Sequence, residues 1–380
     1  MDIKLLSQGS YGCIFKPGVN CENNELTKKY ITKVQKQKET SKKETKIGKE
    51  IQKIVQYERY FAPIIETCKL NLKKINNNEI KKCNFIDTNK IDSYESNQIL
   101  FVGDKTLFTY LPELINTKNS LKKLLKIYIL LLEGLKKLHE KDIIHLDIKE
   151  NNIIITDQGK PKIIDFGLSF ILKDLDNKSY KDVFFVYAPE YNPWCIEIAV
   201  INYIIHKLNI EWMNKDITIE ILEKIVNDYI KYNGAIKDLF TENEKIIIKE
   251  NYINYLKGKM TTGEKMIKEL MLTSTTWDTY SLNIVYLDIL NLMSLSEFEL
   301  ITKIKGSLKT SIMSSPDKRK NPKNTIHQIN EICKNIKRQD YAGINEKISQ
   351  LDTIQLSKKI QKSKIIEQKI ENPIYKIILF

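Results

Sequence analysis

The sequence predicts an α+β fold, because strand-like segments and helical patterns both occur along the chain. A strand-like segment occurs early, at residues 30–34. Apolar side chains that recur every three or four residues predict a helix with one apolar face over residues 121–139. Two short strand patterns, at 152–155 and 162–164, flank the turn sequence 157–160 and predict a hairpin.

Composition restricts the classes of protein to which the chain can belong. At 380 residues the chain does not require a second independent domain. The formal charge of +13 reflects an excess of lysine that accompanies many isoleucines and asparagines, which suggests an AT-rich coding sequence and makes a nucleic-acid partner unlikely. The six cysteines lack paired metal spacing, and there is neither a signal peptide nor an apolar run of 18 residues. We therefore expect a soluble, reducing, intracellular setting with no membrane contact.

Two acidic groups and one asparagine occur at a spacing that suits phosphoryl transfer. The run from His145 to Asn152 contains Asp147, and Asp165 follows 18 residues after that aspartate. The predicted hairpin returns Asp165 to the side of Asn152. One carboxylate can then orient and deprotonate an attacking hydroxyl, while the asparagine and the second carboxylate hold Mg²⁺ ions that neutralise the phosphate.

At these residues the chain resembles the eukaryotic-type serine/threonine protein kinases. The resemblance implies that Asp147 is the catalytic base and that Lys149 steadies the γ-phosphate of ATP. It also implies that Asn152 and Asp165 are the Mg²⁺ ligands. His145 is expected to lie beneath Phe166 and to act neither as an acid nor as a base.

Residues 7–14, Ser-Gln-Gly-Ser-Tyr-Gly-Cys-Ile, resemble the glycine-rich loop of this family, with Ser7 in place of its first glycine. Glycine has no Cβ atom to keep backbone N–H groups away from phosphate oxygens. An ordinary glycine-containing turn is the alternative interpretation. The resemblance assigns nucleotide contacts to Gly9, Ser10, Tyr11, Gly12, Ile14 and Ile154.

Lys33 lies in the strand-like segment 30–34, where the family has the lysine that binds the α- and β-phosphates. The helix that follows should supply a glutamate to pair with it, and Glu50 matches best. Glu44 is the second choice, and either glutamate could instead belong to a solvent-exposed i,i+4 pair. Ile31 is bulkier than the family's residue at that position and would narrow the adenine slot.

Three later segments continue the resemblance in the family's order. Tyr187-Ala188-Pro189-Glu190 resembles the end of the activation segment, and Trp277-Asp278 resembles the start of a long buried helix. Asp278 is then expected to bind the backbone of the catalytic loop. Arg319, one of only three arginines, is expected to form a buried ion pair with Glu190.

Several features depart from the family pattern without removing a catalytic group. Leu146 replaces a common arginine, the usual threonine is missing from residues 182–186, and Ser7 and Ile31 alter the nucleotide site. Leucine cannot bind a phosphorylated activation segment, so we expect activity without that modification. The 88 residues from Glu190 to Asp278 must include an insert, whose apolar pattern is helical and whose sequence has no catalytic signature.

We therefore expect a two-lobed, protein-kinase-like fold that uses ATP and Mg²⁺ to phosphorylate an unknown protein substrate. The small lobe should cover residues 1–110 and the large lobe 111–338, with a helical insert at about 191–276 and a C-terminal extension at 339–380. The insert and short activation segment also resemble divergent kinases of large DNA viruses, which would place the protein in host cytoplasm or a virion. A pseudokinase scaffold, a small-molecule kinase and a nucleic-acid-binding module are the alternatives.

Overall fold

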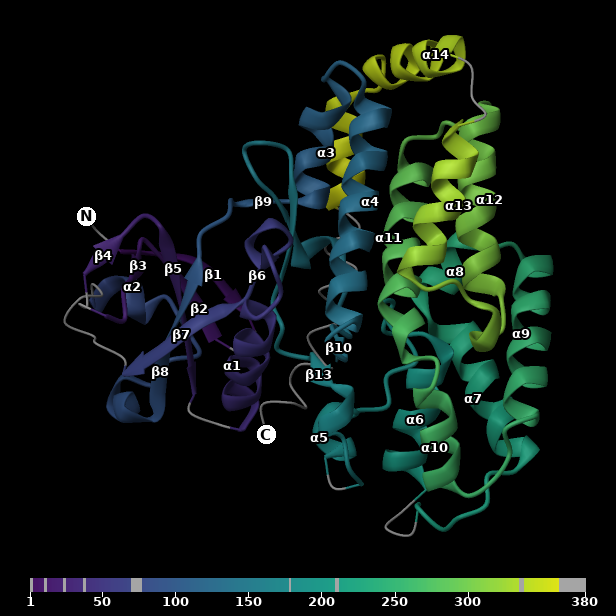
Figure 1. Cartoon of the computed structure of the whole chain (residues 1–380), viewed down its shortest axis with the longest axis horizontal. Helices are drawn as coiled ribbons and strands as arrows, with labels where there is room; N and C mark the ends of the chain where they lie inside the picture. Colours follow the sequence, from purple (N-terminus) through teal and green to yellow (C-terminus); the bar gives the residue numbers. More distant parts are fainter. Residues whose placement is uncertain are drawn as a thin grey trace.

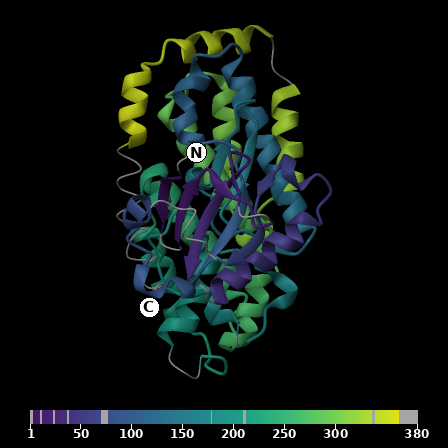
Figure 2. The ribbon, with the colours of Figure 1, turned by 90° about the vertical axis from the view of Figure 1, so that its left-hand side faces the viewer.

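A computed structural model describes residues 3–9, 12–22, 25–36, 39–69, 77–177, 179–208, 212–334 and 338–361. Figure 1 shows a sheet-rich N-terminal lobe beside a larger helical lobe, and in the turned view of Figure 2 the sheet stands in front of the helices. The predicted α+β class is therefore confirmed. The division at about residue 110 lies close to the start of helix α3, Leu107–Ile115.

The small lobe is built on a five-stranded antiparallel sheet in the order β1-β2-β5-β8-β7. The strands are β1 (Lys4–Gly9), β2 (Gly12–Lys16), β5 (Tyr30–Lys36), β7 (Ile64–Lys69) and β8 (Tyr94–Leu100). Helix α1 (Glu39–Gln52) packs against β7, and α2 (Asn77–Lys81) follows that strand in the chain. Gly12 permits the close approach of β2 and β5, because a Cβ atom there would lie 2.1 Å from the carbonyl oxygen of Val34.

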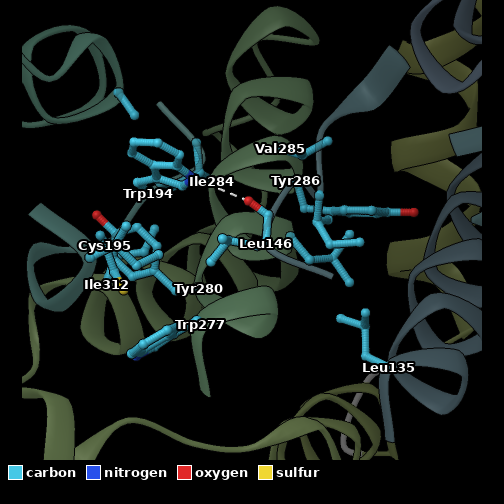
Figure 3. Close-up of a cluster of buried hydrophobic side chains, with 14 of the residues drawn as sticks. Leu135, Leu146, Trp194, Cys195, Trp277, Tyr280, Ile284, Val285, Tyr286 and Ile312 are labelled. Atoms are coloured by element: carbon cyan, nitrogen blue, oxygen red, sulfur yellow. Dashed lines mark hydrogen bonds between the residues drawn. The ribbon is translucent and has the colours of Figure 1, made fainter. Parts of the chain in front are cut away.

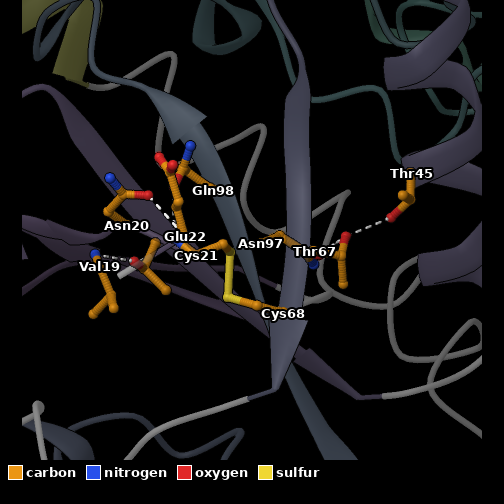
Figure 4. Close-up of a disulfide and its surroundings, with 10 residues drawn as sticks. Val19, Asn20, Cys21, Glu22, Thr45, Thr67, Cys68, Asn97 and Gln98 are labelled. Atoms are coloured by element: carbon orange, nitrogen blue, oxygen red, sulfur yellow. Dashed lines mark hydrogen bonds between the residues drawn. A yellow bond between two sulfur atoms is a disulfide. The ribbon is translucent and has the colours of Figure 1, made fainter. Parts of the chain in front are cut away.

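Two disulfides join distant parts of the small lobe. Cys13 is bonded to Cys83, and Cys21 is bonded to Cys68 beside the sheet, as Figure 4 shows. The sequence did not predict these pairs, because each joins residues at least 47 positions apart. Disulfides persist in oxidising environments, so they do not agree with the reducing setting inferred from cysteine spacing.

A second sheet connects the small lobe to the catalytic residues. Its order is β6-β12-β11-β9, with β6 (Phe61–Ala62), β9 (Lys105–Thr106), β11 (Ile153–Ile155) and β12 (Pro161–Ile164). The predicted hairpin is confirmed, since β11 and β12 are antiparallel and Gly159 supplies a positive φ of 70° in their turn. Asp165 directly follows β12. Two further strands, β10 (Ile143–Ile144) and β13 (Phe170–Ile171), pair around the catalytic loop.

The large lobe is organised around two buried helices, α4 and α11. The predicted amphipathic helix is α4, Ser120–His139, and its apolar face is buried along its whole length. Helix α11, Trp277–Leu292, is buried on nearly all sides. Asn345 on α14 (Arg338–Ser349) accepts hydrogen bonds from the start of α4, so the described part of the C-terminal extension is anchored there. Residues 362–380 lie outside the described residues.

The segment between Tyr191 and Trp277 is helical, as its pattern predicted. It contains α6 (Ile196–Lys207), α7 (Ile219–Tyr232), α8 (Gly234–Leu239), α9 (Glu242–Lys257) and α10 (Gly263–Met271). The expected inward face of α7 is confirmed, with Leu222, Ile225, Val226 and Tyr229 buried. The remaining helices are α5 (Tyr180–Val183), α12 (Glu299–Met313) and α13 (Pro322–Lys334). None of the described helices is both long enough and apolar enough to span a bilayer.

Candidate active site

Lys33 is buried on β5 and links the small lobe to the catalytic hairpin. Its Nζ lies 2.9 and 3.0 Å from the two carboxylate oxygens of Glu44 on α1 and 3.1 Å from Oδ1 of Asp165. Gln35 donates a further hydrogen bond of 2.9 Å to Glu44. Burial by itself would lower the pKa of Lys33, but the charges of Asp165 and Glu44 outweigh it and raise that pKa above its usual value. Lys33 therefore stays positively charged at neutral pH.

Asp165 lies at the end of β12 with a positive φ of 59°, a conformation that non-glycine residues seldom adopt. Burial acts to raise the pKa of its carboxyl group, but the charge and hydrogen bond of Lys33 dominate and lower it. Its side chain keeps 38% of its surface exposed. An ionised carboxylate is thus held by Lys33 on one side and remains accessible to a ligand on the other.

Asp147 lies in the catalytic loop, surrounded by three polar side chains. Asn152 Nδ2 donates to its backbone carbonyl at 2.9 Å and to its Oδ2 at 2.8 Å. Lys149 Nζ lies 3.5 Å from the same Oδ2 atom. The hydroxyl of Tyr191 donates to Oδ1 of Asp147 and accepts a hydrogen bond of 3.2 Å from Lys149. The structure therefore brings a carboxylate, an ammonium group and a phenol together at one point.

Asp278 on α11 holds the catalytic loop from below. Its carboxylate accepts backbone hydrogen bonds of 2.9 Å from both His145 and Leu146, the contact that the resemblance implied. Burial would raise the pKa of Asp278, but the hydrogen bond and charge of His139 lower it. Leu146 has a positive φ of 66°, and its carbonyl accepts a hydrogen bond of 3.1 Å from the indole of Trp194 (Figure 3). The unusual backbone of the loop is thus fixed on two sides.

The predicted metal ligands offer the oxygen atoms that Mg²⁺ prefers. Asp165 presents a carboxylate, and Asn152 uses its amide nitrogen toward Asp147, which leaves its Oδ1 without a hydrogen bond among the described residues. Those residues contain no group of three histidine, cysteine or acidic side chains placed to hold a metal ion. This donor set fits Mg²⁺, which is usually bound by one or two protein ligands together with substrate phosphates and water.

The other predicted nucleotide contacts lie on the β1–β2 hairpin and on β11. Gly9 and Gly12 pair at the end of the hairpin, and Ile14 pairs with Lys33 across β2 and β5. Ile154 is buried in β11, the strand that follows the catalytic loop. Ser10 and Tyr11 lie outside the described residues.

Comparison with known proteins agrees with this geometry. The family model described as "Protein kinase domain" matches residues 2–193. This chain belongs to the protein kinase domain family. The matched residues contain the five-stranded antiparallel sheet and the beginning of the helical lobe, through α5.

Curated relatives match shorter parts of the chain. "Mitosis inhibitor protein kinase SWE1" of Candida albicans is 32% identical over 178 residues, which are 46% of this chain and 14% of the relative. "MAP kinase kinase MKK1/SSP32" of Saccharomyces cerevisiae is 35% identical over 92 residues, 24% of this chain and 18% of the relative. "Serine/threonine-protein kinase 17A" of Oryctolagus cuniculus is 49% identical over 47 residues, 12% of each. The chain thus spans less than a fifth of the length of each of these relatives.

The structure corrects the predicted partner of Lys33, which is Glu44 and not Glu50. Glu50 instead forms an exposed pair with Lys53, with its carboxylate 2.6 Å from Nζ. Six residues along a helix correspond to a rotation of about 240°, so the two glutamates project from different sides of α1. Glu44 faces Lys33 on the sheet and is 4% exposed, whereas the side chain of Glu50 is 28% exposed and pairs with Lys53.

The structure also corrects the partner of Arg319, which is Glu197 and not Glu190. Nη1 of Arg319 lies 2.8 and 2.7 Å from the two oxygens of Glu197, and both side chains are fully buried. The sequence Ala-Pro-Glu at residues 188–190 matched the family motif, but the glutamate that contacts Arg319 is Glu197, in the first turn of α6 and seven residues after Glu190. Trp277 and Thr273 also donate to Glu197, each at 3.1 Å, so its carboxylate is well satisfied.

Tyr191 is a site residue that the sequence analysis missed. It lies beyond the Ala-Pro-Glu match, at a position to which the resemblance assigns no role. Only the path of the chain after Pro189 brings its hydroxyl to Asp147 and Lys149. No sequence signal marks this contact, since tyrosine is common in the chain and no helical or strand pattern covers position 191.

Proposed function

We propose that this protein transfers the γ-phosphate of Mg·ATP to serine or threonine hydroxyls of a protein substrate. One observation carries the proposal: Lys33 contacts Glu44 and Asp165 at the same time. In the same structure, Lys149 lies 3.5 Å from the carboxylate of Asp147. In protein kinases the lysine–glutamate pair and the second aspartate must both be in place for phosphoryl transfer.

Each polar residue then has a role that its position supports. Lys33 binds the α- and β-phosphates, and Glu44 keeps its ammonium group in place. Asn152 and Asp165 hold Mg²⁺, which neutralises the developing charge on the transferring phosphoryl group when it is bound. Nucleotide contacts are assigned to Gly9, Gly12 and Ile14 on the β1–β2 hairpin and to Ile154 on β11. Ser10 and Tyr11 keep the same assignment from the sequence alone.

Asp147 orients the acceptor hydroxyl and takes up its proton as the oxygen bonds to the γ-phosphorus. The bond from that phosphorus to the β,γ-bridging oxygen breaks, and ADP leaves. Lys149 places a positive charge 3.5 Å from that carboxylate, where it can stabilise the transferring phosphate. The acceptor must replace or share the hydrogen bond that Tyr191 makes to Asp147. Lys149 is also the feature that favours a protein substrate over a small molecule, because small-molecule kinases with a similar loop lack a lysine at that position.

A pseudokinase scaffold is the second candidate, and the residues present argue against it. Pseudokinases commonly lose the strand lysine, the catalytic aspartate or the metal-binding aspartate, and Lys33, Asp147 and Asp165 are all retained. We also infer a source among large DNA viruses, because the short activation segment and the large-lobe insert resemble their divergent kinases and the composition is compatible with that source. Host cytoplasm or the virion would be its location, and the two disulfides favour the less reducing of the two. We propose the lobe boundaries 1–110 and 111–338, the insert 191–276 and the extension 339–380 as functional divisions of the chain.

The test is phosphoryl transfer from labelled Mg·ATP to a panel of generic protein substrates, followed by phospho-amino-acid analysis. We expect labelled phosphoserine or phosphothreonine. Asp147→Asn and Asp165→Asn should each reduce the rate by at least about 10²-fold while circular dichroism shows a folded protein. Wild-type turnover in either variant would refute the assigned roles. ATP binding without transfer would favour a scaffold, and salt-sensitive binding of nucleic acid without ATP turnover would favour a nucleic-acid-binding module.

A further inference from the structure

The carboxylate of Glu44 is connected to the far edge of the sheet by a line of hydrogen bonds. Gln35 lies two residues after Lys33 on β5 and donates a hydrogen bond of 2.9 Å to Oε2 of Glu44. Its own Oε1 accepts a hydrogen bond of 2.6 Å from Nδ2 of Asn97 on β8. The Oδ1 atom of Asn97 accepts a hydrogen bond of 2.7 Å from the hydroxyl of Thr67 on β7. Three neutral side chains therefore lead from the edge strand to the carboxylate that holds Lys33.

The same line of hydrogen bonds returns to helix α1 at Thr45, the residue after Glu44. The hydroxyls of Thr45 and Thr67 lie 3.0 Å apart, and Figure 4 shows the two side chains turned toward each other. Because Thr67 uses its one hydroxyl hydrogen toward Asn97, Thr45 is the donor in this pair. Thr45, Thr67, Asn97, Gln35 and Glu44 thus form a closed chain, which we call the polar ring. It begins and ends at adjacent residues of α1.

The pleat of the sheet explains why these side chains meet. Lys33 pairs with Asn97 across β5 and β8, and Asn97 pairs with Thr67 across β8 and β7. Directly paired residues lie on the same face of a sheet, and so does Gln35, two positions from Lys33. Helix α1 covers this face, since it packs against β7 and its Glu44 reaches Lys33. The polar ring is therefore assembled from four separate elements by tertiary packing.

The polar ring constrains a helix that has few apolar side chains to fix its rotation. Among the residues of α1 whose burial is described, the buried apolar side chains are Ile47 and Ile51. Gln35, Asn97 and Glu44 are each no more than 4% exposed. A buried polar network favours a single arrangement, because rotation of α1 would leave a buried donor or acceptor without its partner. The ring therefore determines which face of α1 is turned toward Lys33.

We propose that the four neutral members of the polar ring are positioning residues for phosphoryl transfer. They act through Glu44: by holding its carboxylate and the rotation of α1, they keep the ammonium group of Lys33 in place for the α- and β-phosphates. Side chains that act in this way affect the rate only while Glu44 is present to be positioned. The inference rests on the proposed protein kinase function and adds the residues that keep α1 in its active orientation.

The first test compares two substitutions of Thr67 that differ in the hydroxyl. Thr67→Val removes the hydroxyl from a side chain of the same shape, and Thr67→Ser keeps it. We expect Thr67→Val to lower kcat by about two- to tenfold, the equivalent of one hydrogen bond, with KM for the protein substrate unchanged. Thr67→Ser should restore most of that loss. Gln35→Met removes the direct donor to Glu44 and should lower kcat at least as much as Thr67→Val.

Thr32→Val is the matched control for loss of stability. Thr32 is fully buried in the same strand as Lys33, and its hydroxyl accepts a hydrogen bond of 2.8 Å from the backbone N–H of Val19. As the neighbour of Lys33 in the strand, it faces the opposite side of the sheet. Thr32→Val should lower Tm as Thr67→Val does, but it should leave kcat unchanged at temperatures where both variants are folded. An equal loss of kcat in the two variants would overturn the proposal, because general destabilisation would then explain the effect.

A double-variant cycle with Glu44→Gln tests whether the ring acts through Glu44. Thr67→Val and Gln35→Met should each lower kcat on their own, but they should cause no further loss once Glu44→Gln is present. Fully additive losses in the double variants would overturn the proposal. A Thr67→Ser variant as slow as Thr67→Val would overturn it as well.

Hydrogen–deuterium exchange of the full chain measures the position of α1 without relying on activity. Amides of α1, residues 39–52, should exchange faster in Thr67→Val and Gln35→Met than in the wild type. Thr67→Ser and Thr32→Val should show the wild-type rate in α1. If the wild-type protein phosphorylates no substrate, the proposed function fails, and the exchange experiment still decides the role of the ring. Unchanged exchange of α1 in both Thr67→Val and Gln35→Met would overturn that role.

Discussion

Replacing Arg319 by alanine should strongly destabilise the large lobe. The substitution leaves the Glu197 carboxylate fully buried without its charged partner, beside neutral donors such as Trp277 and Thr273. Removing one partner of a buried pair typically costs about 3–5 kcal/mol. The guanidinium also lies over the rings of Tyr252 and Tyr280, at 5.4 and 4.8 Å from their centroids, so packing is lost as well.

The assay is thermal unfolding followed by circular dichroism at constant protein concentration. At roughly 2–4 °C per kcal/mol for a domain of this size, we expect Tm to fall by roughly 6–20 °C. Glu197→Gln should give a similar loss, because it leaves Arg319 buried and unpaired. Glu190→Gln is the matched control, since Glu190 does not contact Arg319, and it should change Tm little.

A double variant separates the charge from the packing. Glu197→Gln combined with Arg319→Met removes both charges and should recover much of the stability lost by either single change. An unchanged Tm in Arg319→Ala would show that the buried pair contributes nothing. Equal losses from Glu190→Gln and Glu197→Gln would show that the position of α6 relative to Arg319 is wrong.

Three further predictions concern the active site and its surroundings. Glu44→Gln should lower kcat by at least about tenfold, equivalent to about 1.4 kcal/mol, whereas Glu50→Gln should leave kcat nearly unchanged. Steady-state kinetics of both variants with the same substrate measure this, and a larger loss of kcat in Glu50→Gln would contradict the assignment. Because folding raises the pKa of Asp288 from 3.8 to about 6, ionisation of this group destabilises the fold progressively as pH rises through that window. Asp288→Asn should therefore gain up to about 3 kcal/mol relative to wild type between pH 4 and pH 7 in urea titrations, and a pH-independent difference would contradict the assignment. Phosphatase-treated protein and the Ser179→Ala variant should keep most of their activity, because Leu146 cannot bind a phosphorylated activation segment. Ser169, the other serine of that segment, is fully buried against the carbonyl of His145 and is inaccessible to modification. A tenfold loss of activity in either experiment would refute activity without phosphorylation.

Local sequence signals predicted the elements but not the partners of the charged residues. The apolar periodicity of α4 and the turn sequence around Gly159 each depend on a few neighbouring residues. Helix α4 and the β11–β12 hairpin could therefore be predicted from the sequence. The choice between Glu44 and Glu50 depends on which face of α1 turns toward Lys33, and a lysine-rich helix with few apolar residues leaves that orientation undefined. Tertiary packing decides it.

The same reason explains the errors after Pro189. Glu190 matched a short motif, but the partner of Arg319 is set by where α6 begins, and the first turn of that helix carries Glu197. Long-range contacts therefore determined most of what the sequence analysis missed.

The helical segment 191–276 supplies contacts that can replace a phosphate in ordering the active site. Tyr229 on α7 donates a hydrogen bond of 2.8 Å to the carbonyl of Trp194, whose indole in turn holds the Leu146 carbonyl. Asn233, at the start of α8, donates to the carbonyl of Tyr191 at 3.2 Å. These bonds fix the chain on both sides of the Tyr191 contact with Asp147, at the place where Leu146 offers no group to bind a phosphate. Order at the catalytic loop therefore depends on the packing of α7 and α8, although neither helix carries a predicted catalytic residue.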